Sequence, residues 1–188
     1  MPAPDSSLLG KVATQLRRPP AYAESGLQAS ILVAAATSYG AHSPDDLTQP
    51  TGFDPEAARL FEAIVESAFL VANSDGDFDA TEREAFEHVV LSACDGRVAE
   101  RQLSALLADL ADLLAEDGID KRVGMVARSV SRPDHAQEVL RVASLLAFVS
   151  GGVSPVERQT LDKLAGALGL AATATALALS AVATALAD

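Results

Sequence analysis

The sequence has a single cysteine, no tryptophan and only 4% aromatic residues. One cysteine excludes an internal disulfide framework and any zinc site built from several cysteines, and it is compatible with a reducing compartment. Because 49% of the 188 residues are nevertheless apolar, alanine and leucine must fill most of the core, which favours helices over sheets. A chain of this length can bury a core without a disulfide or a structural metal.

Signatures of catalysis and of export are also missing. The chain has no phosphate-binding glycine loop and no G-x-S-x-G elbow, and no two of its histidines lie at metal-ligand spacing. We therefore expect a non-enzymatic protein, with His42, His88 and His135 at the surface or at helix caps and Cys94 as a small buried side chain. The opening residues lack the basic and apolar regions of a secretory signal, which predicts a cytoplasmic protein.

Positive charge is scarce in the middle of the chain. The net charge is −12, and residues 45–120 alone carry 19 acidic residues against four arginines, a net of −15. This balance disfavours broad nucleic-acid binding through phosphate contacts, so we expect no nucleic-acid partner. The acidic block is either a solvated face that keeps the protein soluble or a surface for cations or for a basic partner.

Apolar residues recur at helical spacing along almost the whole chain, and β alternation is almost absent, which predicts an all-α protein. Asp54 with Pro55 is typical of a helix start, and residues 79–82 and 154–157 each form a capping box. Helices are expected over residues 7–18, 27–39 (with Gly40 at its end), 54–72, 80–94, 98–117, 121–130, 134–149, 155–168 and 171–187. A segment rich in proline and glycine, residues 41–53, divides an N-terminal extension (1–53) from a core domain (54–170) and an alanine-rich C-terminal helix (171–188).

Two segments of the predicted core domain share one pattern. Each has an apolar helix, a turn with glycine, a capping box and a second amphipathic helix, over residues 68–83 and 145–158. Aligning Gly76 with Gly152 also aligns Glu82 with Glu157. We therefore expect a compact domain of two helix-hairpin repeats packed across a pseudo-twofold axis.

The first repeat resembles the tellurite-resistance TerB-like family, because an apolar helix leads through Ala72 to Asp75-Gly76 and then to Glu82. The second repeat has Gly151 where that family commonly has aspartate. The resemblance covers roughly residues 54–170. It implies a compact helical domain with a duplicated core, acting as a non-enzymatic cytoplasmic module linked to metal or tellurite stress. It also implies acidic residues that bind divalent cations.

The densest group of potential ligands lies in the acidic stretch of the first repeat. Oxygen atoms at alternate positions of a turn can converge on a hard cation such as Ca²⁺ or Mg²⁺, and the candidate ligands are Asp75, Asp77, Asp79, Glu82 and Glu84. The stretch is not an EF-hand, because Phe78 stands where that loop needs glycine. A structural explanation remains open, since Asp79 and Glu82 form the capping box and Asp75 can bond turn amides.

Two further features leave alternatives open. Glu62 and Glu66, one turn apart on the preceding helix, are either additional ligands or a solvated pair.

The uncharged segments 27–39 and 171–187 either pack on the core domain or bind a protein partner or a second copy, and we expect them to pair with each other. Gly169 limits the tail helix to a length of about 25 Å, which is shorter than the bilayer core of about 30 Å. The sequence therefore disfavours a membrane span. The alternative function is thus a structural or adaptor subunit that docks into a larger assembly, membrane-associated or not.

Overall fold

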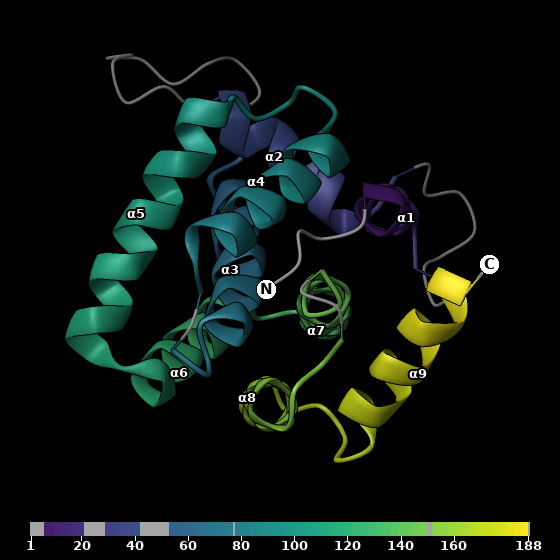
Figure 1. Cartoon of the computed structure of the whole chain (residues 1–188). Helices are drawn as coiled ribbons and strands as arrows, with labels where there is room; N and C mark the ends of the chain where they lie inside the picture. The colour runs from purple at the N-terminus through teal and green to yellow at the C-terminus, as the bar shows by residue number, and fades with distance from the viewer. Residues whose placement is uncertain (1–5, 21–28, 42–52, 77, 150–151, 188) are drawn as a thin grey trace.

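The structure is a computed structural model that describes residues 6–20, 29–41, 53–76, 78–149 and 152–187. Within these residues the chain forms helices and no strand, so the predicted all-α class is confirmed (Figure 1). The helices are α1 (Ser6–Arg17), α2 (Ile31–Ala41), α3 (Pro55–Ala72), α4 (Ala80–Cys94), α5 (Glu100–Asp117), α6 (Ile119–Ser129), α7 (Pro133–Leu146), α8 (Pro155–Ala167) and α9 (Ala174–Ala187).

Helices α3 and α7 pack against each other in the middle of the molecule (Figure 1). The sequence of α3 is apolar on almost every side, and every residue from Ala63 to Val71 is buried. A helix of that kind must be surrounded by other elements. Accordingly α2, α5, α6 and α8 also contact α3, whereas α1, α2, α8 and α9 contact α7.

Both predicted capping boxes are confirmed. At the start of α4 the Asp79 carboxylate accepts from the Glu82 backbone N–H at 2.9 Å, and Glu82 accepts from the Asp79 N–H at 3.2 Å. At the start of α8 the Ser154 hydroxyl accepts from the Glu157 N–H at 3.1 Å, and Glu157 accepts from the Ser154 N–H at 2.7 Å. The Asp54 cap of α3 is also present. Thus α3 and α7 are each followed by a turn and a capped helix, as the repeat predicts.

Helix α2 begins and ends later than the sequence predicts. It runs from Ile31 to Ala41, so Gly40 lies inside the helix rather than after it, and residues 42–52 of the predicted loop lie outside the described residues. Gly40 lies at a close approach between two segments, because a Cβ atom at this position would lie 1.6 Å from the carbonyl oxygen of Arg97. Glycine is needed here so that α2 can pack against the loop between α4 and α5.

The expected pairing of the tail helix with residues 27–39 is wrong. Helix α9 packs on α7, α8 and α1, whereas α2 packs chiefly on α3. The last carbonyls of a helix lack partners within the helix, and α1 supplies donors to them. Lys11 Nζ and Gln15 Nε2 each donate at 3.1 Å, to the carbonyl oxygens of Leu186 and Ala185.

Side chains from both predicted extensions belong to the same core as α3 and α7. They include Val12 and Leu16 of α1, Leu32 of α2 and Val182 of α9. The division of the chain at residues 53 and 170 stays a prediction from composition. In the described part of the chain no helix is both long and apolar enough to cross a bilayer.

Candidate functional site

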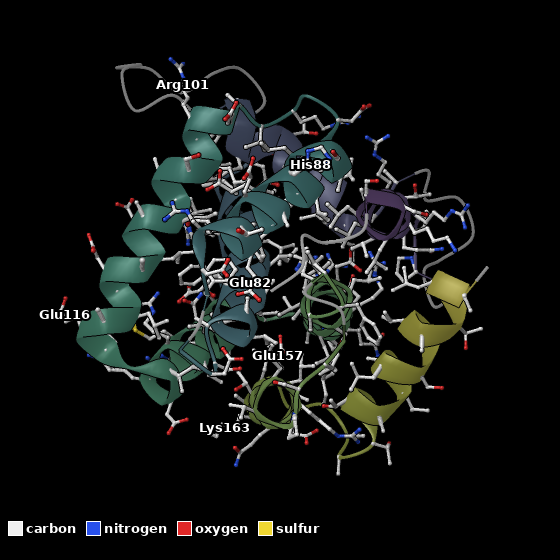
Figure 2. All side chains as sticks on the ribbon, viewed as in Figure 1. Glu82, His88, Arg101, Glu116, Glu157 and Lys163 are labelled. Carbon is white, nitrogen blue, oxygen red and sulfur yellow. The ribbon has the colours of Figure 1, made fainter. Side chains whose placement is uncertain are left out.

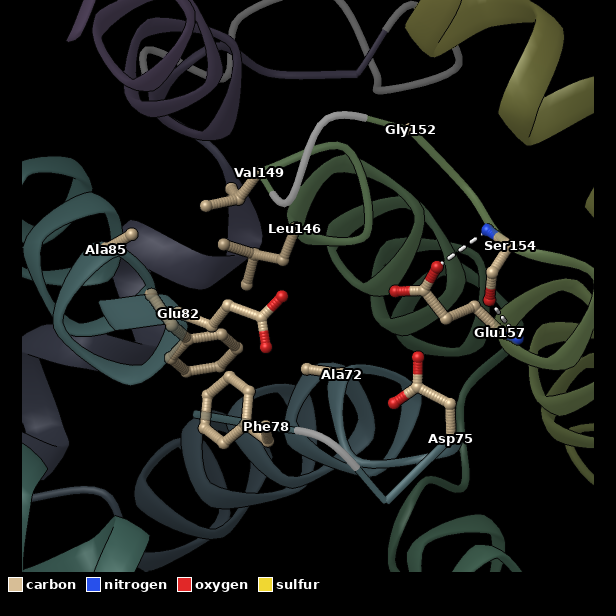
Figure 3. A pocket seen from close by; sticks show the side chains of 11 residues that line it. Ala72, Asp75, Phe78, Glu82, Ala85, Leu146, Val149, Gly152, Ser154 and Glu157 are labelled. Atoms are coloured by element: carbon tan, nitrogen blue, oxygen red, sulfur yellow. Dashed lines mark hydrogen bonds between the residues drawn. The ribbon is translucent and has the colours of Figure 1, made fainter. Parts of the chain in front are cut away.

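A cavity of about 150 Å³ lies between the two turns that follow α3 and α7. Figure 3 shows the carboxylates of Asp75, Glu82 and Glu157 facing one another across it. The remaining wall is largely apolar and includes Ala72, Phe78, Ala85, Phe86, Leu146 and Val149. Three acidic side chains from two repeats therefore share one small cavity with an apolar floor.

The capping boxes place two of these carboxylates. Glu82 and Glu157 both occupy the third position of a helix, where an acidic side chain reaches back to the backbone of the cap residue. In both residues the bond to the cap engages Oε2, so Oε1 stays outside that bond. Figure 2 shows Glu82 and Glu157 in the space between α4, α7 and α8, whereas Glu116 projects outward from α5. The local fold that begins each helix therefore also aims its glutamate at the cavity.

Phe78 fixes the turn that carries Asp75. Its ring makes edge-to-face contacts with Phe69 and Phe86, at centroid distances of 5.8 and 5.9 Å. This arrangement is favoured between aromatic rings. Gly76 has a φ of 85°, a conformation that glycine adopts without strain. The aromatic residue that rules out an EF-hand is thus an anchor that holds the turn against the core.

Glu157 is the buried member of the three carboxylates. Burial raises its pKa, the charges of Asp75 and Glu82 raise it further, and hydrogen bonds from Ser154 lower it in part. Burial and like charges both disfavour the ionised form of an acid. The cavity therefore favours whatever balances the negative charge of Glu157, either a proton or a cation.

The predicted ligand set is brought together only in part. Asp75 and Glu82 line the cavity, whereas the Asp79 carboxylate is bound to backbone N–H groups at the start of α4. Glu84 is exposed on α4 and does not line the cavity, and Asp77 lies outside the described residues. Within those residues no group of three or more histidine, cysteine, aspartate or glutamate side chains could hold a metal ion as they stand.

Sequence reasoning assigned Glu157 only a capping role. Its partners Asp75 and Glu82 precede it by more than 70 residues, so spacing along the chain does not reveal the contact. The signal that could have found it is the repeat itself, because the alignment that pairs Gly76 with Gly152 also pairs Glu82 with Glu157. If one glutamate faces a cavity between two related turns, the other does so as well.

Glu66 is buried in an ion pair rather than solvated, whereas Glu62 is exposed. The Glu66 carboxylate accepts from Arg122 Nε at 2.6 Å, and Arg122 also donates to Asp117 at 3.2 Å. Burial raises the pKa of Glu66, and the Arg122 guanidinium lowers it in part. A buried acid needs such a partner, and here the partner ties α6 to α3.

The cysteine and the described histidines do not belong to any group that could hold a metal ion among the residues that the structure describes. Cys94 is fully buried, and burial raises its pKa to about 12, so the thiolate is disfavoured. His88 is exposed and His135 is half-buried with its pKa lowered, first by desolvation. His42 lies outside the described residues.

These features define a class of protein, namely a compact all-helical module in which two repeats present acidic side chains to one cavity. A sequence model of the family described as "Tellurite resistance protein TerB" matches residues 61–180, which is more than half of the chain. The chain therefore belongs to the TerB family, and the match includes every residue that lines the cavity. The comparison with curated proteins and the comparison with solved structures each found no match.

Proposed function

We propose that this chain is a non-enzymatic TerB-family module whose cavity binds one divalent cation, Ca²⁺ or Mg²⁺, through Asp75, Glu82 and Glu157. The observation that carries the proposal is the shared cavity, into which three carboxylates from two repeats point. The family description, tellurite resistance protein, supports a role for the module in tellurite resistance.

The chemistry of the cavity favours a hard cation. All three acidic side chains offer oxygen, and neither cysteine nor histidine lines the cavity among the described residues, whereas zinc sites use those two residue types. A volume of about 150 Å³ equals several water molecules of about 30 Å³ each. It therefore has room for a cation together with part of its hydration shell, which Mg²⁺ in particular retains.

Cation binding requires the side chains to close around the ion. The capping bonds hold Oε2 of Glu82 and Glu157, which leaves Oε1 of each to turn toward the cation while the helix caps stay intact. Asp75 approaches from the turn after α3. Because Gly151 stands in the second repeat where the family commonly has aspartate, we propose a single cation rather than a symmetric pair.

Calorimetric titration of the full chain with Ca²⁺ and with Mg²⁺ tests the proposal. The informative variants are Glu157→Gln and Glu82→Gln, because glutamine still accepts the backbone bond of a capping box but carries no charge. We expect each variant to lose at least about tenfold in affinity, since hydrogen bonds and ion contacts of a charged group contribute about 1.5–3 kcal/mol.

The matched control is Glu84→Gln, which makes the same change on the exposed side of α4. It should bind the cation as tightly as the wild type. Equal affinity in wild type and in Asp75→Asn/Glu157→Gln would overturn the proposal. An equal loss in Glu84→Gln would show that only the overall negative charge of the chain attracts the cation.

The second candidate function, docking as a structural or adaptor subunit, is favoured by one observation. Helix α9 has no charged residue, and its Leu177 is 67% exposed. The other proposed surface is weaker, because Leu32, Val33 and Ala36 of α2 are buried. Light scattering after size-exclusion chromatography tests this function through α9, since a Leu177→Glu variant should then dissociate a complex that the wild type forms.

A further inference from the structure

A second and larger cavity opens between α9, α7 and the end of α1. This groove has a volume of about 710 Å³ and shares no lining residue with the acidic cavity. Its walls are mostly small or apolar side chains, among them Leu140 and Leu145 of α7, Leu170, and Ala174, Ala178 and Ala181 of α9. Figure 1 shows α9 at the edge of the molecule, and α9 contacts α7 there.

The charge on the groove is of one sign. Arg18 and Arg141 line it and no acidic residue does so among the described residues, although the chain has 26 acidic and only 14 basic residues. The Arg141 guanidinium is balanced, because it binds the buried Glu138 carboxylate at 2.7 Å and donates to the Gln15 carbonyl at 3.0 Å. Arg18 is exposed and forms no ion pair within the described part of the chain. The α1 end of the groove therefore offers an available cation.

The composition and exposure of α9 indicate that a ligand or a partner covers its face toward the groove. It has no charge, yet only Thr175 and Val182 of its 14 residues are buried. A helix that is apolar on all sides is normally buried, and a contiguous exposed apolar patch marks a site for a ligand or a partner.

The volume of the groove suits a small-molecule ligand. The groove has about 710 Å³, which lies within the range of about 300–1,000 Å³ for small-molecule sites. Such sites are mostly apolar with a few placed polar groups, as this one is.

We propose that the groove binds a long-chain fatty acid. The alkyl chain lies along the alanines of α9 and against Leu140 and Leu145, where it removes apolar surface from water. The carboxylate lies at the α1 end, where the Arg18 guanidinium can bind both of its oxygens.

Direct titration of the full chain with parinaric acid, a fatty acid that is itself fluorescent, tests this proposal. We expect saturable binding that palmitate displaces. Arg18→Gln should weaken palmitate binding by about tenfold, because it removes one charged hydrogen-bonding partner, but should leave displacement by the uncharged methyl ester of palmitate unchanged.

The matched pair Ala181→Trp and Ala183→Trp tests the position of the chain. Both residues are exposed on α9, but Ala181 lines the groove and Ala183 does not. Only Ala181→Trp should abolish binding. Equal effects of the two variants, or no saturable binding by the wild type, would overturn the proposal. So would a dimer in light scattering that Ala181→Trp dissociates, because the groove would then belong to a second copy of the chain.

Discussion

Glu157 caps a helix and also carries a buried charge. Its Oε2 accepts the Ser154 N–H, which stabilises the start of α8, but its carboxylate faces Asp75 and Glu82 across the cavity. The cap requires only an acceptor, which a neutral side chain can provide. The charge is therefore an additional cost to stability, and it is explained if the residue has a ligand to bind.

This cost predicts a pH dependence. The folded pKa of Glu157 is raised above 4.5, so between the two values the native state binds more protons than the unfolded state. The free energy of unfolding then falls as pH rises through that window. In the presence of a chelator, we expect the melting temperature of Glu157→Gln to exceed that of the wild type by an amount that grows from pH 4.5 toward neutrality. Thermal denaturation across this range measures the difference.

The Glu84→Gln variant is again the control, because its side chain is exposed on α4. Its difference from the wild type should stay constant across the window. If the Glu157→Gln difference also stays constant, burial of the Glu157 charge does not limit the stability of the cation-free protein.

The Glu66–Arg122 pair predicts an asymmetry between single and double substitutions. Both side chains are about nine-tenths buried, at 11% and 8% exposed. Arg122→Met leaves Glu66 buried without its partner, which should cost about 3–5 kcal/mol. Replacing both residues, as Glu66→Leu/Arg122→Met, should recover most of that loss. Urea denaturation measures both, and a double variant no more stable than the single one would contradict the explanation.

At the scale of the elements, the sequence predicts every helix of the described residues but not which helices contact one another. Asp54, the two capping boxes and Gly118 mark helix ends through bonds to near neighbours, so local sequence is sufficient to find them. The partner of α9 depends on Lys11 and Gln15, about 170 residues away. The site divides in the same way, because Asp75 and Glu82 lie in one local motif, whereas Glu157 joins them only through the packing of α3 on α7.

The close approach of α2 to the loop after α4 predicts a strong effect at Gly40. In Gly40→Ala the new Cβ would overlap the Arg97 carbonyl. This carbonyl belongs to the backbone, so it cannot move away as a flexible side chain could. We expect the free energy of unfolding to fall by about 1–3 kcal/mol, the usual cost of overpacking.

The control is Gly124→Ala in α6, where a Cβ meets nothing within 4 Å. That change should stabilise the protein by about 0.5–1 kcal/mol, because alanine favours the helix. Equal effects of the two substitutions in urea denaturation would contradict the role of Gly40.

Across the whole molecule, basic residues of the flanking segments are paired with the acidic block of residues 45–120. Arg17 of α1 lies 3.5 Å from Asp95, Arg122 binds Glu66, and Lys163 of α8 lies 2.6 Å from Asp120. These pairs join the middle of the chain to both ends, but the 26 acidic residues still outnumber the 14 basic ones, which leaves a net charge of −12. Repulsion among the remaining carboxylates destabilises the compact state, and salt should weaken that repulsion.

The excess negative charge means that any cation raises stability to some degree, so the test of a specific site must separate binding from screening. At equal ionic strength, CaCl₂ should raise the melting temperature of the wild type more than NaCl does. A ligand at 100 times its Kd adds about 2.7 kcal/mol to the free energy of unfolding, which corresponds to a rise of roughly 5–10 °C in melting temperature for a chain of this size.

In Asp75→Asn/Glu157→Gln the two salts should act alike, because screening depends on overall charge and this variant keeps most of that charge. Glu84→Gln/Glu116→Gln removes the same charge from two exposed positions and should keep the full response to CaCl₂. A response lost equally in both double variants would assign the calcium effect to the acidic surface as a whole.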